Sequence, residues 1–107
     1  MTHKLRETLN VPIVCTLQGE DYFLDGLPES QRAEAWSLLQ KRAADVDAFI
    51  GVSRYYGDTM RARLNLSPEK VSTIYNGIDL SGYGPLRQAH GAPTIGFLSR
   101  MAPEKGL

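Results

Sequence analysis

Two cations, Arg100 and Lys105, follow an apolar segment near the end of the sequence, with Pro103 between them. The segment Thr94–Leu98 predicts a buried strand of a parallel sheet, because it is a short block of β-branched and bulky apolar residues. Ligands of open α/β sheets bind at the carboxyl ends of strands. A guanidinium can hold two phosphate oxygens, an ammonium adds a point charge, and a helix beginning near Lys105 would direct N–H groups to the same place. The pattern predicts an anion site, and the alternative is an exposed turn with two solvated charges.

A second polar group follows the apolar segment Val11–Leu17, which predicts a strand with its proline at the start. The group consists of Gln18, Gly19, Glu20 and Asp21. It would lie at the carboxyl end of that strand, where substrate-binding groups gather. We therefore expect Gln18, Gly19 and Asp21 to contact a substrate, and the alternative is a solvated acidic turn.

The dipeptide Asn76-Gly77 combines the two residue types that best tolerate a positive φ, so it predicts a tight turn. Its main role is expected to be structural. Gly96 lies inside the last apolar segment, where a glycine can mark a bulge.

The sequence Y-N-G-I-D at Tyr75–Asp79 is followed by a spacer with a proline and then by I-G-F-L-S-R-M-A-P-E-K-G-L at Ile95–Leu107. This order resembles the middle of a family 4 (group 1) glycosyltransferase of the GT-B type. Such enzymes carry an N-G-[IV]-D turn that closes the first domain and a G-R-x-x-x-E-K-G-like turn that opens the second. The resemblance extends over about Val11 to Leu107 and implies a central fragment of such an enzyme.

The fold that the resemblance implies is α/β: a partial Rossmann-like (GT-B) parallel sheet with flanking helices, truncated at both ends. Residues 1–80 would be the C-terminal portion of the amino-terminal, acceptor-side domain. Residues 81–92 would be the interdomain linker. Residues 93–107 would supply the first strand and the phosphate-binding turn of the donor-binding domain.

The function that the resemblance implies is retaining transfer of a hexosyl group from a nucleoside-diphosphate sugar to a sugar or lipid acceptor, without a metal or other cofactor. Arg100 and Lys105 would act in catalysis by neutralising the donor diphosphate as it leaves. By the same resemblance, Gly96 would let the donor approach the backbone closely, and the turn at Asn76 and Gly77 would lie beside the cleft and make a secondary donor contact. Many family members have His where this sequence has Gln18, and Gln cannot transfer a proton near neutral pH. We expect the parent protein to be an enzyme and the 107 residues alone to be inactive. The alternative function is a non-catalytic small α/β binding or interaction module.

The composition narrows the choice of partners. Twelve basic and twelve acidic residues give no net charge, so nothing supports bulk attraction to nucleic acid. Cys15 is the only cysteine, and His3 and His90 lie far apart, so neither a disulfide framework nor a metal site is expected. No signal peptide or membrane span is evident, so we expect a cytoplasmic location. Peripheral membrane contact of the parent and self-association through unpaired strand edges stay open.

The elements that must position these residues alternate along the chain, and a parallel sheet with crossover helices is expected. The aromatic residues Trp36, Tyr55 and Tyr56 lie at helical spacing, which favours a role in core packing over a role in stacking against a sugar.

The segment Tyr22–Pro28 is expected to be a loop. Strands are predicted over Val11–Leu17, Ala48–Val52 and Val71–Tyr75; helices over Thr2–Leu9 with a stop at Asn10, from Glu29 to about Val46, and from Arg54, capped by Ser53, to about Asn65; and a single turn at Pro68–Lys70.

Overall fold

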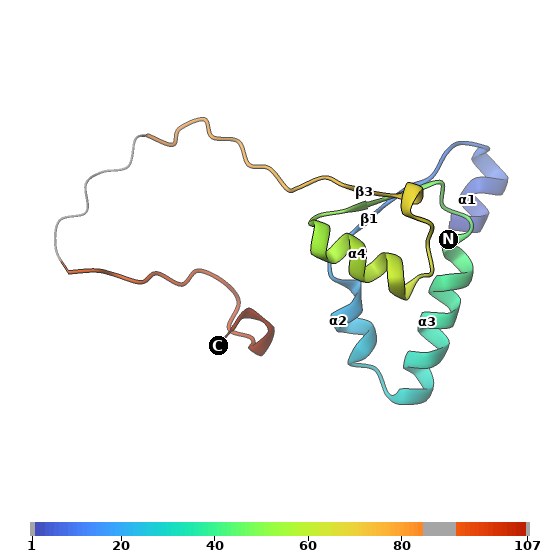
Figure 1. Ribbon diagram of the computed structural model, residues 1–107, viewed down its shortest axis with the longest axis horizontal. Coiled ribbons are helices and arrows are strands. Elements are labelled where there is room, and N and C mark those ends of the chain that lie inside the picture. The colour runs from blue at the N-terminus through green and yellow to red at the C-terminus, as the bar shows by residue number, and fades with distance from the viewer. Residues whose placement is uncertain (1, 85–91, 107) are drawn as a thin grey trace.

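The computed structural model describes residues 2–84 and 92–106 of the chain. A three-stranded parallel sheet in the order β1-β2-β3 forms its centre, with helices before and between the strands (Figure 1). The predicted α/β class, with a parallel sheet and flanking helices, is confirmed. The elements are α1 (Thr2–Leu9), β1 (Val14–Leu17), α2 (Glu20–Asp25), α3 (Glu29–Ala43), β2 (Ala48–Gly51), α4 (Arg54–Arg63), the 3-10 turn η1 (Pro68–Lys70), β3 (Val71–Thr73) and the 3-10 turn η2 (Pro103–Lys105).

The strand register brings the carboxyl ends of the strands to one edge of the sheet. Leu17 lies opposite Gly51, and Gly51 lies opposite Thr73. The segments that leave the strands therefore begin side by side, as expected for a site at this edge.

The core lies on one face of the sheet, between the strands and the helices α3 and α4. Met60 of α4 is fully buried, and Phe49 of β2 lies in the same cluster. On β1, Leu17 is buried, whereas Val14 and Thr16, which point to the opposite face, are exposed. The buried apolar residues are Leu17, Ala43, Val46, Phe49, Met60 and Leu64.

Helix α4 begins and packs as its sequence dictates. The hydroxyl of Ser53 accepts a hydrogen bond from the Tyr56 N–H at 3.1 Å, which confirms the predicted cap. Gly57 lies against Gly51 of β2: a Cβ atom added at Gly51 would stand 2.7 Å from the Gly57 Cα. The two glycines therefore allow the helix backbone to approach the strand more closely than a side chain at Gly51 would permit.

A polar cluster joins α2, α3 and α4 at their outer surface. The Asp25 carboxylate accepts hydrogen bonds from Trp36 Nε1 at 3.1 Å and from Arg63 Nη1 at 2.7 Å. The Arg63 guanidinium carbon lies 4.9 Å from the centre of the Trp36 ring. The bond from Arg63, followed by that from Trp36, lowers the pKa of Asp25. Trp36 thus packs partly against the core, as predicted, while its polar edge binds the end of α2.

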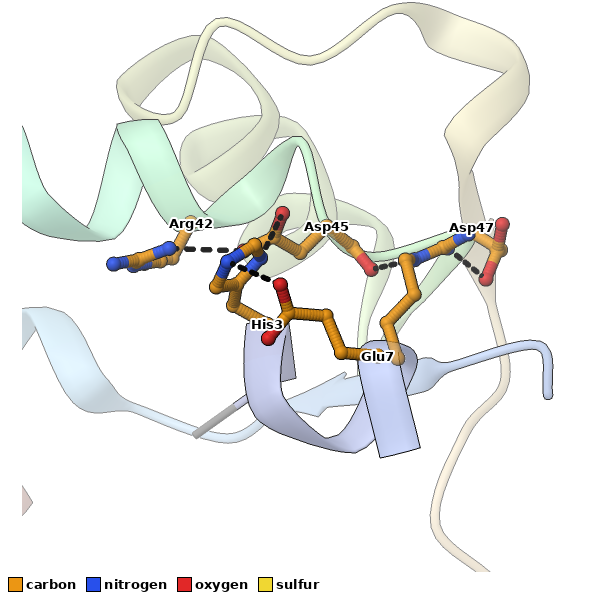
Figure 2. A network of polar contacts seen from close by, with 6 residues as sticks. His3, Glu7, Arg42, Asp45 and Asp47 are labelled. Atoms are coloured by element: carbon orange, nitrogen blue, oxygen red, sulfur yellow. Dashed lines mark hydrogen bonds and ion pairs between the residues drawn. The ribbon is translucent and has the colours of Figure 1, made fainter. Parts of the chain in front are cut away.

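Helix α1 is held to the rest of the chain by polar contacts rather than by apolar packing (Figure 2). Arg6 pairs with the Asp47 carboxylate, and its Nε donates to the Asp45 carbonyl at 3.0 Å. The Asp47 carboxylate also accepts from the Ile13 N–H at 2.7 Å. These two donors, Arg6 first, lower the pKa of Asp47. The same network includes His3, Glu7 and Arg42.

The predicted loop over Tyr22–Pro28 is wrong in its first half, because α2 continues to Asp25. Gly19 adopts a left-handed conformation with φ of 115° immediately before this helix. The Glu20 carboxylate then accepts hydrogen bonds from the N–H groups of Gln18 and Gly19. This local arrangement starts a short helix that apolar periodicity did not reveal.

The tight turn predicted at Asn76-Gly77 is also wrong, since neither residue has a positive φ. The turn lies further on, where the Tyr83 N–H donates to the Leu80 carbonyl at 3.0 Å and Gly82 has φ of 89°. The Asp79 carboxylate accepts from the Ser81 N–H at 2.8 Å. That contact lowers the pKa of Asp79 and stabilises the turn at this later position.

The strand predicted over Thr94–Leu98 is not formed, and residues 93–102 contain neither helix nor strand. Ile95 is 99% exposed, and no strand in the described ranges lies beside this segment. A single extended segment without a neighbour cannot make sheet hydrogen bonds. Gly106, with φ of 84°, follows η2, so Lys105 ends a short 3-10 turn instead of beginning a helix. Residues 85–91 of the predicted linker lie outside the described residues.

The close approach of α4 to β2 predicts opposite effects for the two glycines. Gly51→Ala should lower the free energy of unfolding by about 2 kcal/mol, because its Cβ meets backbone atoms that cannot move aside. Gly57→Ala should raise it by roughly 0.5–1 kcal/mol, since its Cβ would meet nothing nearer than 3.6 Å and Ala favours a helix. Urea unfolding of both variants measures the two changes, and equal effects would contradict this packing.

The contacts of Asp47 predict a pH dependence. A carboxyl whose pKa is lowered by folding stabilises the protein above its unfolded pKa, near 4. This stabilisation should disappear as the pH falls through the lower, folded value. The difference in unfolding free energy between the wild type and Asp47→Asn should therefore shrink from pH 6 to pH 2.5, as followed by urea titration. A difference that stays constant over this pH range would show that the Asp47 charge contributes nothing to the free energy of unfolding.

Candidate functional site

Polar side chains gather at the edge where the parallel strands end. Gln18 and Gly19 directly follow β1, and both are exposed. Ser53 follows β2 by two residues and begins α4. The Ile74 N–H donates to the Gly51 carbonyl at 3.0 Å, so the chain leaving β3 starts beside this edge.

Glu20 folds back over the end of β1. Its two carboxylate oxygens each lie 3.0 Å from the Gln18 nitrogen, and Oε2 lies 3.2 Å from the Gly19 nitrogen. The left-handed conformation of Gly19 lets both N–H groups point toward this carboxylate. The contact fixes the direction in which the Gln18 backbone leaves the sheet.

The Tyr56 hydroxyl connects α4 to the two acidic residues of α2. Its oxygen lies 2.9 Å from Asp21 Oδ1 and 3.0 Å from Glu20 Oε2, and the Asp21 N–H donates to it at 3.5 Å. Partial burial, followed by the hydrogen bond to Asp21, raises the pKa of Tyr56. The hydroxyl therefore stays protonated at neutral pH and donates to either carboxylate. The remaining carboxylate lone pairs and the Gln18 amide are suited to binding hydroxyl groups.

The structure brings together some of the predicted site residues and separates others. Gln18, Gly19 and Asp21 lie within the strand-end cluster. Asn76 and Gly77 lie in the exposed, extended segment after β3, which leads away from the sheet (Figure 1). The remaining three, Gly96, Arg100 and Lys105, belong to the carboxyl-terminal segment, which lies apart from the sheet.

Sequence reasoning assigned both Tyr55 and Tyr56 to the core and so missed the role of one hydroxyl. Tyr55 is 80% exposed, so that prediction was wrong for this residue. Tyr56 does pack against the core, but its polar end reaches α2. The sequence held one signal for this role: Tyr56 lies in the first turn of the helix that follows β2, three residues after the Ser53 cap.

A comparison with protein families matches residues 1–81 to Glycosyltransferase Family 4. The chain belongs to this family. The parallel sheet with flanking helices is consistent with a partial Rossmann-like GT-B domain, as the resemblance implied. Searches of curated proteins and of solved structures gave no match.

Two further observations describe this family 4 domain. Within residues 2–84 and 92–106, no three His, Cys, Asp or Glu side chains are grouped as a metal site would need. In the same part of the chain, every helix is too short or too polar to cross a bilayer.

The cluster at the strand ends predicts that Tyr56→Phe lowers the free energy of unfolding by about 1–2 kcal/mol, because two carboxylates lose their common donor. Exchange of the Asp21 amide hydrogen should also become faster, since that N–H loses its acceptor. Tyr55→Phe is the matched control and should change neither quantity. Denaturant unfolding and NMR hydrogen exchange measure both.

The raised pKa of Tyr56 adds a pH signature with a defined sign. A group whose pKa is raised by folding stabilises the protein below its unfolded pKa, near 10 for tyrosine. That stabilisation is lost as the pH rises further. The wild type should therefore lose stability relative to Tyr56→Phe above about pH 10. Parallel curves for the two proteins from pH 8 to 11 would contradict the assignment.

Proposed function

We propose that this chain is part of a nucleotide-sugar-dependent retaining glycosyltransferase that transfers a hexosyl group to a sugar or lipid acceptor. The family match over residues 1–81 carries the proposal, since this range includes the polar cluster at the strand ends. In this proposal, the cluster binds the acceptor and the carboxyl-terminal segment contributes to the donor site. A cytoplasmic location is part of the same proposal.

On the acceptor side, Gln18 and Asp21 are proposed to bind hydroxyl groups. The exposed Gln18 amide can both donate and accept, but it cannot take a proton near neutral pH. Gln18 therefore orients the acceptor and does not act as a general base. The carboxylates of Glu20 and Asp21, held by Tyr56, supply further hydrogen-bond acceptors.

On the donor side, Arg100 and Lys105 are proposed to neutralise the diphosphate. When the bond between the sugar and the diphosphate breaks, negative charge grows on the leaving group, and fixed cations stabilise it. Each such contact is worth about 3 kcal/mol of barrier if it resembles an oxyanion contact. Two cations supply this charge without a metal ion. Gly96 would allow close approach of the donor, and Asn76 with Gly77 would make secondary contacts.

A binding experiment on the chain tests the donor side. Titration of the ¹⁵N-labelled chain with UDP-glucose, GDP-mannose or pyrophosphate should shift the amide signals of Lys105 and Gly106. Uridine, which has no phosphate, should not shift them. Arg100→Ala and Lys105→Ala should each weaken binding about tenfold or more, because one charged contact is lost. Lys41→Ala, which removes one positive charge from α3, is the control and should bind as the wild type does.

Equal binding by the wild type and by both turn variants would refute the assigned roles of Arg100 and Lys105. We further expect the 107-residue chain to release no nucleotide from these donors. The sequence contains no recognisable motif that would bind the base and ribose of the donor. A nucleotide-release assay with the same sugar donors checks this expectation.

A further inference from the structure

A polar cavity opens at the outer surface of the helices α2, α3 and α4, whose arrangement Figure 1 shows. Its volume is about 410 Å³, which is within the range of small-molecule sites. Asp25 at the end of α2 and Arg63 at the end of α4 form part of its wall. One side of α3 forms the rest, through residues at helical spacing: Glu29, Arg32, Ala33, Trp36 and Gln40.

The cavity is separate from the strand-end cluster and from the edge of the sheet that β1 forms. Arg63 lies seven residues after Tyr56, roughly 10 Å further along α4. The side of α3 that lies next to β1 carries Leu38 and Arg42, and neither residue lines this cavity. All of the lining residues come from residues 25–63, within the range of the family match. The site therefore does not depend on what lies beyond β1.

Hydrogen bonds within the chain hold the side chains of this cavity in place. The Asp25 carboxylate accepts from Trp36 and Arg63, as described above. Arg32 Nη1 donates to the Asp25 carbonyl at 3.2 Å. Gln40 Nε2 donates to the Arg63 carbonyl at 2.7 Å. Each of these bonds joins two different helices, so a ligand would meet side chains that are already positioned before it binds.

The same cavity keeps polar atoms that these bonds do not use. In the part of the chain that the structure describes, the exposed Glu29 carboxylate has neither a hydrogen bond nor an ion pair. The amide oxygen of Gln40 is left to accept, since only its nitrogen is used. Arg32 uses one of its five N–H donors. The cavity therefore offers both donors and acceptors to a ligand.

The charges around the cavity cancel one another. The carboxylates of Asp25 and Glu29 stand against the guanidiniums of Arg32 and Arg63, so the site gives little net attraction to an anion or to a cation. Apolar surface lies between these groups, since Ala33 and the Trp36 ring belong to the same wall. A sugar has hydroxyl groups that both donate and accept, together with apolar C–H groups, and so matches this mixture.

We propose that this cavity binds a neutral carbohydrate. Its hydroxyl groups would donate to Glu29 and Gln40 and accept hydrogen bonds from Arg32. Its C–H groups would contact Ala33 and the Trp36 ring. The proposal is independent of the glycosyl transfer proposed above, because none of these residues belongs to the strand-end cluster or to the carboxyl-terminal segment. Such a site would hold part of a glycan on the surface of the domain without acting in transfer.

The single tryptophan makes binding directly observable. The indole N–H of Trp36 gives one separate signal in a ¹H–¹⁵N NMR spectrum. Titration of the chain with glucose, galactose, mannose, N-acetylglucosamine or maltotriose should shift this signal to saturation with at least one of them. Inorganic phosphate, an anion, and alanine, a zwitterion, should not shift it. A signal that responds to none of these sugars, or only to phosphate or alanine, would overturn the proposal.

Variants of α3 test which groups bind the sugar. Glu29→Ala and Arg32→Ala should each raise its dissociation constant about tenfold, because each removes a charged hydrogen-bonding partner. Glu34→Ala is the matched control, since Glu34 is also exposed on α3 but does not line the cavity. It should bind as the wild type does.

Tyr56→Phe separates this site from the strand-end cluster and should leave sugar binding unchanged. Weaker binding by Tyr56→Phe would assign the sugar to the strand ends instead. Equal binding by Glu29→Ala, Arg32→Ala and the control would likewise refute the site, because the sugar would then bind without the groups proposed to hold it.

Discussion

The contact between Gly51 and Gly57 determines how closely α4 lies on β2, and the position of the strand-end residues depends on it. Tyr56 immediately precedes Gly57 in the helix, so its distance from the sheet follows from that of Gly57. At this distance its hydroxyl reaches both Glu20 and Asp21. The close packing of two glycines thus sets the position of the Tyr56 hydroxyl, which in turn holds the two carboxylates of α2 in place.

Much of the fold followed from local sequence rules. Ser53 was predicted to cap α4, and its hydroxyl does so; Asn10 was predicted to end α1, and it has the positive φ of 49° that such a stop requires. The start of α2 could not be found in this way, because it depends on the Glu20 side chain returning to the backbone before it. The turn after β3 was misplaced for a similar reason, since the Asp79 carboxylate moves it beyond Gly77.

The predictions for the candidate site also differ in whether they depended on neighbouring residues alone or on contacts with other elements. Gln18, Gly19 and Asp21 are neighbours in sequence, so one strand end was enough to place them together. The prediction for Arg100 and Lys105 relied on a strand over Thr94–Leu98, and strands form only beside other strands. The range of the family match ends at residue 81, so it includes Gln18, Gly19 and Asp21 but neither Arg100 nor Lys105. The roles of both groups of residues belong to the proposed function.

The environment of Trp36 has an optical consequence. Trp36 is the single tryptophan of the chain, and its indole touches α2 through Asp25 and α4 through Arg63. All indole fluorescence therefore originates at the junction of three helices, next to a carboxylate and a guanidinium. Its emission is an intrinsic signal for separation of these helices, free of any contribution from the segment that carries Arg100 and Lys105.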